Sequence, residues 1–338
     1  MPNRALVMSG GGSRGAFELG AADYLVTDAG LDFQVIAGVS TGSLNAVMLA
    51  QGRGPEGLRA QVAALKDAWF GIRSAADVYR KRFLGSVLAF ILKDSIYSPE
   101  PLRRLIERHV DSERLRTSGR ELRIGATTLE TGAYTTVDQR HAQVREWALA
   151  SASMPLFFPP VRIGAEAVVD GGLRNVTPLA DAFRALKTLP PPADGQPDEV
   201  YVALASPLAL EPVRSRWKTG RAAAERAVEI LVNEVFREDL SHALAVNRAV
   251  RCYDAMQSEV AGGGAVGQRT LEAMPFRPPK YRVTRIHTIV PEREYSATLE
   301  FDPRKIREAF EAGRAAARSP LDEAALEKAL FNLPRPTA

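Results

Sequence analysis

VIAGVSTGSLNA, at positions 35–46, passes from an apolar run through the pattern Gly-x-Ser-x-Gly into residues that are compatible with a helix. This order predicts a strand, a sharp turn and a helix, with Ser40 at the apex of the turn. Gly38 and Gly42 leave out side chains that would collide where the strand and the helix cross closely. The hydroxyl of Ser40 would then point into a cleft beside a helix N-terminus, which favours negative charge. The stretch therefore predicts a nucleophile whose reaction intermediate carries an oxyanion.

A glycine-rich turn, GGGSRG at positions 10–15, precedes this elbow and joins a predicted buried strand to a predicted helix. It also fits the dinucleotide-binding pattern Gly-x-Gly-x-x-Gly, which requires an acidic residue at the end of the next strand. The next strand ends at Ser40 instead. Consecutive glycines let backbone amides approach a tetrahedral carbon closely, so the turn fits an oxyanion hole better. A nucleotide-binding module remains the alternative from a different class of protein.

A serine hydroxyl is a poor nucleophile until another group accepts its proton. Asp170 ends an apolar strand and is followed by two glycines, so its carboxylate is predicted to lie at a sheet edge where backbone can pass closely. Partial desolvation would raise its basicity and make a direct Ser–Asp pair chemically possible. A histidine triad is formally compatible with the chain order Ser40, Asp170 and either His242 or His287. Those two histidines lie in helix-like and strand-like runs, where a structural or surface role fits better.

The rest of the chain alternates strand-like and helix-like segments, which favours one α/β domain with a mainly parallel sheet. The apolar, proline-punctuated loop at 154–160 is a candidate wall for an acyl pocket. The apolar run at 80–93 is flanked by basic residues and fits either a buried helix or an interfacial one. Residues 221–256 have helical periodicity, and the polar stretch 262–280 is expected to be mobile.

Composition excludes several classes of protein. The chain has 338 residues, of which 46% are hydrophobic and 25% charged, as is ordinary for a globular protein. Its net charge of +4 comes from arginines spread along the chain, so no nucleic-acid partner is expected. The single Cys252 excludes an intramolecular disulfide, and four scattered histidines argue against a metal site. With no secretory or membrane-spanning run seen, we expect a cytoplasmic protein, with peripheral contact to a membrane as an option.

Four stretches together resemble the patatin-like phospholipase family. They are GGGSRG at 10–15, GVSTG at 38–42, the proline-containing segment at 151–160, and DGG at 170–172 with Asn175 and Pro178 after it. Their order and spacing agree with the family over about residues 5–205. A weaker likeness continues through 289–291 and 301–303 to the helix near Ala315.

The resemblance implies a three-layer α/β/α sandwich with a mainly parallel central sheet, and a Ser–Asp dyad that hydrolyses acyl esters of phospholipids, lysophospholipids or neutral lipids. Carried over by position, Ser40 is the nucleophile and Asp170 the base. The oxyanion hole falls on the amides of Gly11, Gly12 and Ser13, with Arg14 steadying the loop. The glycines that support these motifs are Gly10, Gly15, Gly38, Gly42, Gly171 and Gly172. The resemblance implies no metal and no cofactor.

We therefore predict one domain over 1–338, with a catalytic core at about 4–210, a helical insertion at about 211–280 and a C-terminal strand and helices at 281–333. The predicted activity is that of a serine esterase of phospholipase A or lysophospholipase type. An acyltransferase that uses the same serine is the alternative enzyme, and a lipid-binding or nucleotide-binding protein is the alternative from another class. No motif can be assigned to the segments 70–99 and 213–279.

Overall fold

The computed structural model describes the chain except for residues 82–94, 211, 213–219, 262–268, 270–281 and 332–338. The predictions made for the apolar run at 80–93 and for the stretch 262–280 fall almost wholly outside the described residues.

An eight-stranded sheet forms the middle of the molecule, in the order β10-β9-β1-β2-β5-β8-β7, with β6 also paired to β5. The strands are β1 (Arg4–Met8), β2 (Val35–Val39), β5 (Glu121–Thr128), β6 (Tyr134–Val137), β7 (Val161–Ile163), β8 (Glu166–Asp170), β9 (Asp198–Ala203) and β10 (Thr284–Ile289). Neighbours from β10 to β5 are parallel, whereas β6, β7 and β8 pair antiparallel. β3 (Arg80–Lys81) and β4 (Tyr97–Ser98) form a separate pair.

Helices cover both faces of this sheet. They are α1 (Gly15–Asp23), α2 (Thr41–Leu49), α3 (Gly54–Phe70), α5 (Glu100–His109), α6 (Ser112–Thr117), α7 (Val144–Ser151), α8 (Leu179–Thr188), α9 (Gly220–Ala261), α11 (Pro303–Ala316) and α12 (Glu323–Phe331). Side chains of a strand alternate between the faces, so Leu6 and Met8 of β1 join one buried cluster and Ala5 and Val7 the other. α1, α2 and α3 contribute to the first cluster, and α8, α9 and α12 to the second. The prediction of a three-layer α/β/α fold with a mainly parallel sheet is confirmed.

The two edges of β5 explain how distant parts of the sequence meet. A strand residue has one neighbour on each side, and Gly125 pairs with both β2 and β6, whereas Ala126 pairs with both β6 and β8. β2 and β8 therefore share one edge of β5, and β8 takes the place of β2 where β2 ends. The partner of Gly125 is Val39 and the partner of Ala126 is Asp170. The carboxyl ends of the two strands meet, which brings Asp170 next to the residue that follows Val39.

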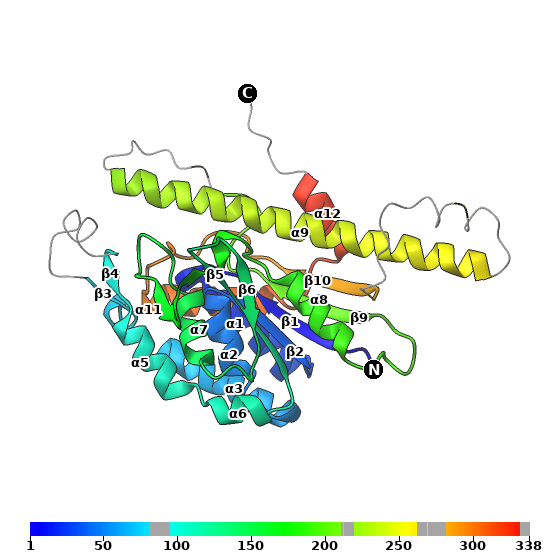
Figure 1. The fold of residues 1–338 in the computed structure, drawn as a ribbon, viewed down its shortest axis with the longest axis horizontal. Coiled ribbons are helices and arrows are strands. Elements are labelled where there is room, and N and C mark those ends of the chain that lie inside the picture. Colours follow the sequence, from blue (N-terminus) through cyan, green and yellow to red (C-terminus); the bar gives the residue numbers. More distant parts are fainter. Residues whose placement is uncertain (82–94, 211, 213–219, 262–268, 270–281, 332–338) are drawn as a thin grey trace.

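Helix α9 is the longest element, with 42 residues, or about 60 Å at the rise of an α-helix. It runs along one side of the molecule and extends beyond the sheet at both ends (Figure 1). Phe236, Leu240 and Ala243 are buried on one face of α9 and belong to the cluster that includes α8. Within the part of the chain that the structure describes, no helix is both long and apolar enough to cross a lipid bilayer. The division of the chain at about residues 210 and 280 stays a prediction.

Candidate active site

Ser40 lies between β2 and α2, in the strand–turn–helix arrangement that the sequence predicts. Its backbone has φ 55° and ψ −130°, a conformation that non-glycine residues rarely adopt and that marks local strain. A Cβ atom on Gly38 would lie 2.2 Å from the Gly42 oxygen, so the strand and the helix cross too closely for a side chain. The amide and the hydroxyl of Ser43 both donate to the Ser40 carbonyl, at 3.0 and 2.6 Å, and close the first turn of α2.

Ser151, at the end of α7, holds this turn from behind. The Ser40 amide donates to Ser151 Oγ at 3.0 Å, and Ser151 Oγ donates to the Gly125 carbonyl of β5 at 2.6 Å. The Ser40 amide is thereby used inside the fold rather than at the cavity. The sequence does not predict this role of Ser151. The one sequence signal for it is that Ser151 is the first residue of the proline-containing segment 151–160.

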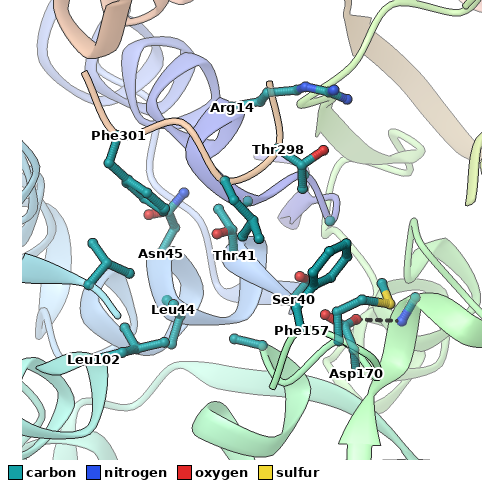
Figure 2. A pocket seen from close by; sticks show the side chains of 18 of the residues that line it. Arg14, Ser40, Thr41, Leu44, Asn45, Leu102, Phe157, Asp170, Thr298 and Phe301 are labelled. Atoms are coloured by element: carbon teal, nitrogen blue, oxygen red, sulfur yellow. Dashed lines mark hydrogen bonds between the residues drawn. The ribbon is translucent and has the colours of Figure 1, made fainter. Parts of the chain in front are cut away.

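Asp170 ends β8 and is 1% exposed. Its Oδ1 accepts the Gly172 amide at 2.8 Å, whereas Oδ2 is buried and has no partner at normal hydrogen-bond geometry in the described structure. Burial raises the pKa of Asp170 to about 7, although the Gly172 amide and the nearby Ser40 hydroxyl lower it. Figure 2 shows the Ser40 and Asp170 side chains at the same end of the pocket. The Ser40 hydroxyl, which lowers this pKa, therefore lies close enough to interact with the carboxylate.

The glycine turn presents two free amides. The Gly10 amide donates to Val176 O at 3.1 Å, the Ser13 amide to Thr298 O at 2.9 Å, and the Arg14 amide to Gly11 O at 3.2 Å. Among the described residues, the amides of Gly11 and Gly12 have no acceptor. Thr298 O already accepts the Ser13 amide in this conformation, so the assignment of Ser13 to the oxyanion hole stays a prediction.

The segment before α11 packs directly on this turn. Gly12 has φ +60°, and a Cβ there would lie 2.0 Å from the Thr298 oxygen. Ser13 Oγ lies 2.8 Å from Ser296 Oγ. The buried Arg14 binds Ser296 O through Nε at 3.0 Å and Ser206 Oγ through Nη1 at 2.9 Å. These contacts fit the predicted role of Arg14 in steadying the loop.

Glu18 of α1 is a second buried carboxyl group beside the turn. Its oxygens accept from Ser9 Oγ and from Asn45 Nδ2, each at 3.2 Å. Asn45 Nδ2 also donates to Gly15 O at 3.1 Å, and Asn45 Oδ1 accepts from Trp69 Nε1 at 2.9 Å. Complete burial raises the pKa of Glu18 well above its ordinary value. The sequence does carry a signal for this residue, because Glu18 is a single acidic residue in the apolar first turn of a helix. The motifs described above do not include it.

These features converge on one cavity of about 440 Å³, a size typical of small-molecule sites. Its lining includes Ser40, Asp170, Gly172, Arg14 and the first three glycines of the turn. The other predicted site residues do not line it: Ser13, Gly15, Gly38, Gly42 and Gly171. Apolar side chains form most of the remaining wall, among them Leu44, Met48, Trp69, Leu102, Ile106 and Phe301. Met154, Phe157 and Phe158 of the proline-containing loop also line the cavity. The site can therefore hold an aliphatic chain next to the serine.

Neither histidine considered for a triad lines this cavity. His242 is exposed on α9, and His287 of β10 stacks on Tyr201 with 4.6 Å between the ring centroids. His109 does line the cavity, among the apolar side chains at the end of α5. Burial lowers the pKa of His109, chiefly by desolvation. The described structure therefore brings a carboxylate, and neither candidate histidine, to the serine.

A three-layer α/β/α fold with a serine elbow at an apolar cavity defines the class of α/β acyl hydrolases. The family model of the patatin-like phospholipases matches residues 6–183, which is more than half of the chain. The chain belongs to this family, and its membership places it among the lipid acyl hydrolases. The suspected resemblance is thereby confirmed.

No curated protein matches the sequence. Among solved structures, VipD from Legionella pneumophila is 12% identical with a TM-score of 0.40, over 98% of this chain and 67% of VipD. The type III effector ExoU is 12% identical with a TM-score of 0.38, over 98% of this chain and 54% of ExoU. A chain in the structure of full-length SpcU in complex with full-length ExoU from Pseudomonas aeruginosa is 18% identical with a TM-score of 0.31. The match covers 72% of this chain and 52% of that chain. The chain thus spans about half the length of ExoU.

Proposed function

We propose that this protein hydrolyses carboxylic acyl esters of phospholipids or lysophospholipids through a Ser40–Asp170 dyad. The observation that carries the proposal is the buried Asp170 carboxylate at the strained elbow of Ser40. Among the described residues its Oδ2 has no hydrogen-bond partner, and the Ser40 hydroxyl lowers its pKa. A carboxylate held in this way is a stronger base than one in water, and it needs no histidine to accept the serine proton.

The reaction has two acyl-transfer steps. Asp170 accepts the Ser40 proton as Oγ attacks the ester carbonyl, and the tetrahedral oxyanion turns toward the Gly11 and Gly12 amides. Each such donor contributes roughly 3–4 kcal/mol to the transition state. The carbon–oxygen bond to the leaving alcohol breaks, and Asp170 returns its proton to that alkoxide. Water then attacks the acyl-serine, Asp170 accepts the proton of the water, and Ser40 leaves with that proton as the fatty acid is released.

The cavity supports an aliphatic acyl group as the part of the substrate that is bound. Apolar side chains from α2, α3 and α5 line it beyond Ser40, and burial of a chain there is favourable by about 0.8 kcal/mol per methylene. A lipid that offers such a chain is presented at a membrane or micelle surface, so peripheral contact with lipid is part of the proposal.

Labelling with a fluorophosphonate probe tests the nucleophile. We expect one adduct, located by peptide mapping at Ser40, together with hydrolysis of a short-chain nitrophenyl ester and of a lysophospholipid. Ser40→Ala should lose both the adduct and the hydrolysis while its circular dichroism is unchanged. Ser258→Ala, which alters an exposed serine on α9, is the matched control and should keep both. An adduct at another residue, or full activity in Ser40→Ala, would contradict the proposal.

A further inference from the structure

Helix α9 reaches the active-site loops through Asp239. Its Oδ2 accepts two consecutive backbone amides, Val176 N at 2.8 Å and Thr177 N at 2.9 Å. The Asn175 side chain, turned so that its nitrogen faces acceptors, donates to the same oxygen at 3.2 Å. Three donors from one short segment therefore converge on one carboxylate oxygen of a helix that lies more than 60 residues further along the chain.

Val176 connects this contact to both sides of the site. Its carbonyl accepts the Gly10 amide at 3.1 Å, which ties it to the start of the glycine turn. Its side chain lines the cavity between the two loops, since Cβ atoms placed on Gly10 and Gly172 would lie 3.7 and 3.8 Å from its methyl groups. A displacement of Val176 would therefore move the oxyanion amides relative to the Asp170 loop.

We propose that Asp239 is a positioning residue that fixes the glycine turn and the Asp170 loop relative to each other, so that α9 is part of the catalytic unit. This inference rests on the proposed function. α9 begins beyond residues 6–183, the part of the chain that the family model matches. The same helix also lines the cavity, through Val232, Asn233 and Phe236. α9 therefore contributes part of the cavity wall as well as the contacts of Asp239.

A simpler role for Asp239 is to satisfy two amides just before α8, which would affect stability alone. That role accounts for the contacts with Val176 and Thr177, but it does not require the bond from Gly10 to the Val176 carbonyl. The two roles differ in what a substitution changes. A stability role predicts a lower melting temperature at an unchanged kcat, and a positioning role predicts a lower kcat.

The surroundings of Asp239 give the positioning role a pH signature. Burial raises the pKa of Asp239 to about 6, with smaller upward contributions from Asp181 of α8 and Glu238 of α9, while the two amides lower it. His242, one turn further along α9, lines a small cavity together with Asp239. Protonation below pH 6 would weaken the contacts with the two amides, because a neutral carboxyl is a poorer acceptor. Loss of these contacts at low pH should make kcat fall more steeply with decreasing pH than protonation of Asp170 alone would. We call this low-pH part of the rate profile its acid limb.

The test measures kcat and KM for a short-chain nitrophenyl ester in the full chain carrying Asp239→Ala or Asp239→Asn. A displacement of about 1 Å at a site can cost on the order of a hundredfold, so we expect Asp239→Ala to lower kcat by about 10- to 100-fold, while KM changes by less than about threefold. Asp239→Asn should recover only part of the kcat, because its neutral amide oxygen still accepts both backbone amides but more weakly than a carboxylate does. Glu234→Gln, which changes an exposed carboxylate on the same helix, should behave as the wild type.

The outcomes separate the two proposals. An active wild type whose Asp239→Ala variant keeps its kcat overturns the positioning role and leaves the dyad standing. A wild type that neither hydrolyses esters nor reacts with the fluorophosphonate at Ser40 overturns the proposed function. If Asp239→Ala fails to fold, Asp239→Asn decides, because its acid limb should titrate as one group where that of the wild type titrates as two. An unchanged limb in Asp239→Asn would contradict the inference.

Discussion

Asp170 and Glu18 are both buried carboxyl groups close to an active-site loop, and burial raises the pKa of both. They differ in what their oxygens bind. Glu18 has a donor on each oxygen, Ser9 Oγ on one and Asn45 Nδ2 on the other, whereas Asp170 keeps Oδ2 without a partner of normal geometry. Burial alone therefore does not mark a base. Under the proposed mechanism, Asp170 accepts the serine proton, whereas Glu18 supports the glycine turn through Ser9 and Asn45.

The way the chain delivers the two groups also differs. Asp170 reaches Ser40 because β8 takes over from β2 along one edge of β5, so two strand ends meet. Glu18 lies on α1, directly after the glycine turn, and connects the residue before the turn to α2. The first arrangement places the Asp170 side chain at the cavity. The second connects the glycine turn to α2 through hydrogen bonds of Glu18.

The largest effect expected from this comparison is on catalysis. Asp170→Asn removes the base but can still accept the Gly172 amide, so kcat for a nitrophenyl ester should fall by about 10²- to 10⁴-fold. Glu18→Gln keeps the shape and the acceptor facing Asn45, so its kcat should fall by less than about tenfold. Both variants should retain the circular dichroism of the wild type. Equal losses of kcat in the two variants would show that Asp170 and Glu18 do not differ in their roles in catalysis.

The second effect is the pH dependence of the rate. Asp170 must be ionised to accept the serine proton, and its pKa lies at about 7. The value of kcat/KM should therefore fall as pH is lowered through about 7, approaching about tenfold per unit, and reach a plateau above pH 8. The rate can be followed at the isosbestic wavelength of the released nitrophenol. Glu18→Gln should leave the midpoint in place, and a midpoint near pH 4 in the wild type would show that Asp170 is not the desolvated base.

The parts of the site that could be predicted from the sequence are those written in local patterns. The elbow at Ser40 and the glycine turn each lie within six residues, and the DGG motif marks Asp170 at the end of a strand. Each of these patterns constrains the backbone directly, so the strand–turn–helix geometry follows from the residues. The long helix could be predicted for the same reason, from the helical periodicity of residues 221–256.

The supporting contacts could not be predicted, because their partners are far apart in the chain. Ser151 binds Ser40 across 111 residues, and Arg14 binds Ser296 across 282. Thr298 occupies the Ser13 amide, and nothing in the sequence near either residue indicates that pairing. Such contacts depend on which strand lies beside which, and one sequence does not fix that order.

The smallest effect is on stability, and it tests the same burial by a different measurement. The pKa of Asp170 is raised from 3.8 to about 7, so the folded state binds its proton more tightly than the unfolded state does. Its contribution to stability is full at low pH and is lost as pH rises from about 4 to about 7, by at most about 4 kcal/mol. Asp170→Asn has no such loss. Its melting temperature should therefore exceed that of the wild type by a few degrees at pH 8, where two or three degrees correspond to about 1 kcal/mol, and by much less at pH 4. Glu259→Gln, at an exposed position on α9, is the control and should show no such difference. A gap of equal size at both pH values would mean that the Asp170 carboxyl is not desolvated in the folded protein, and the comparison with Glu18 would then rest on hydrogen bonds alone.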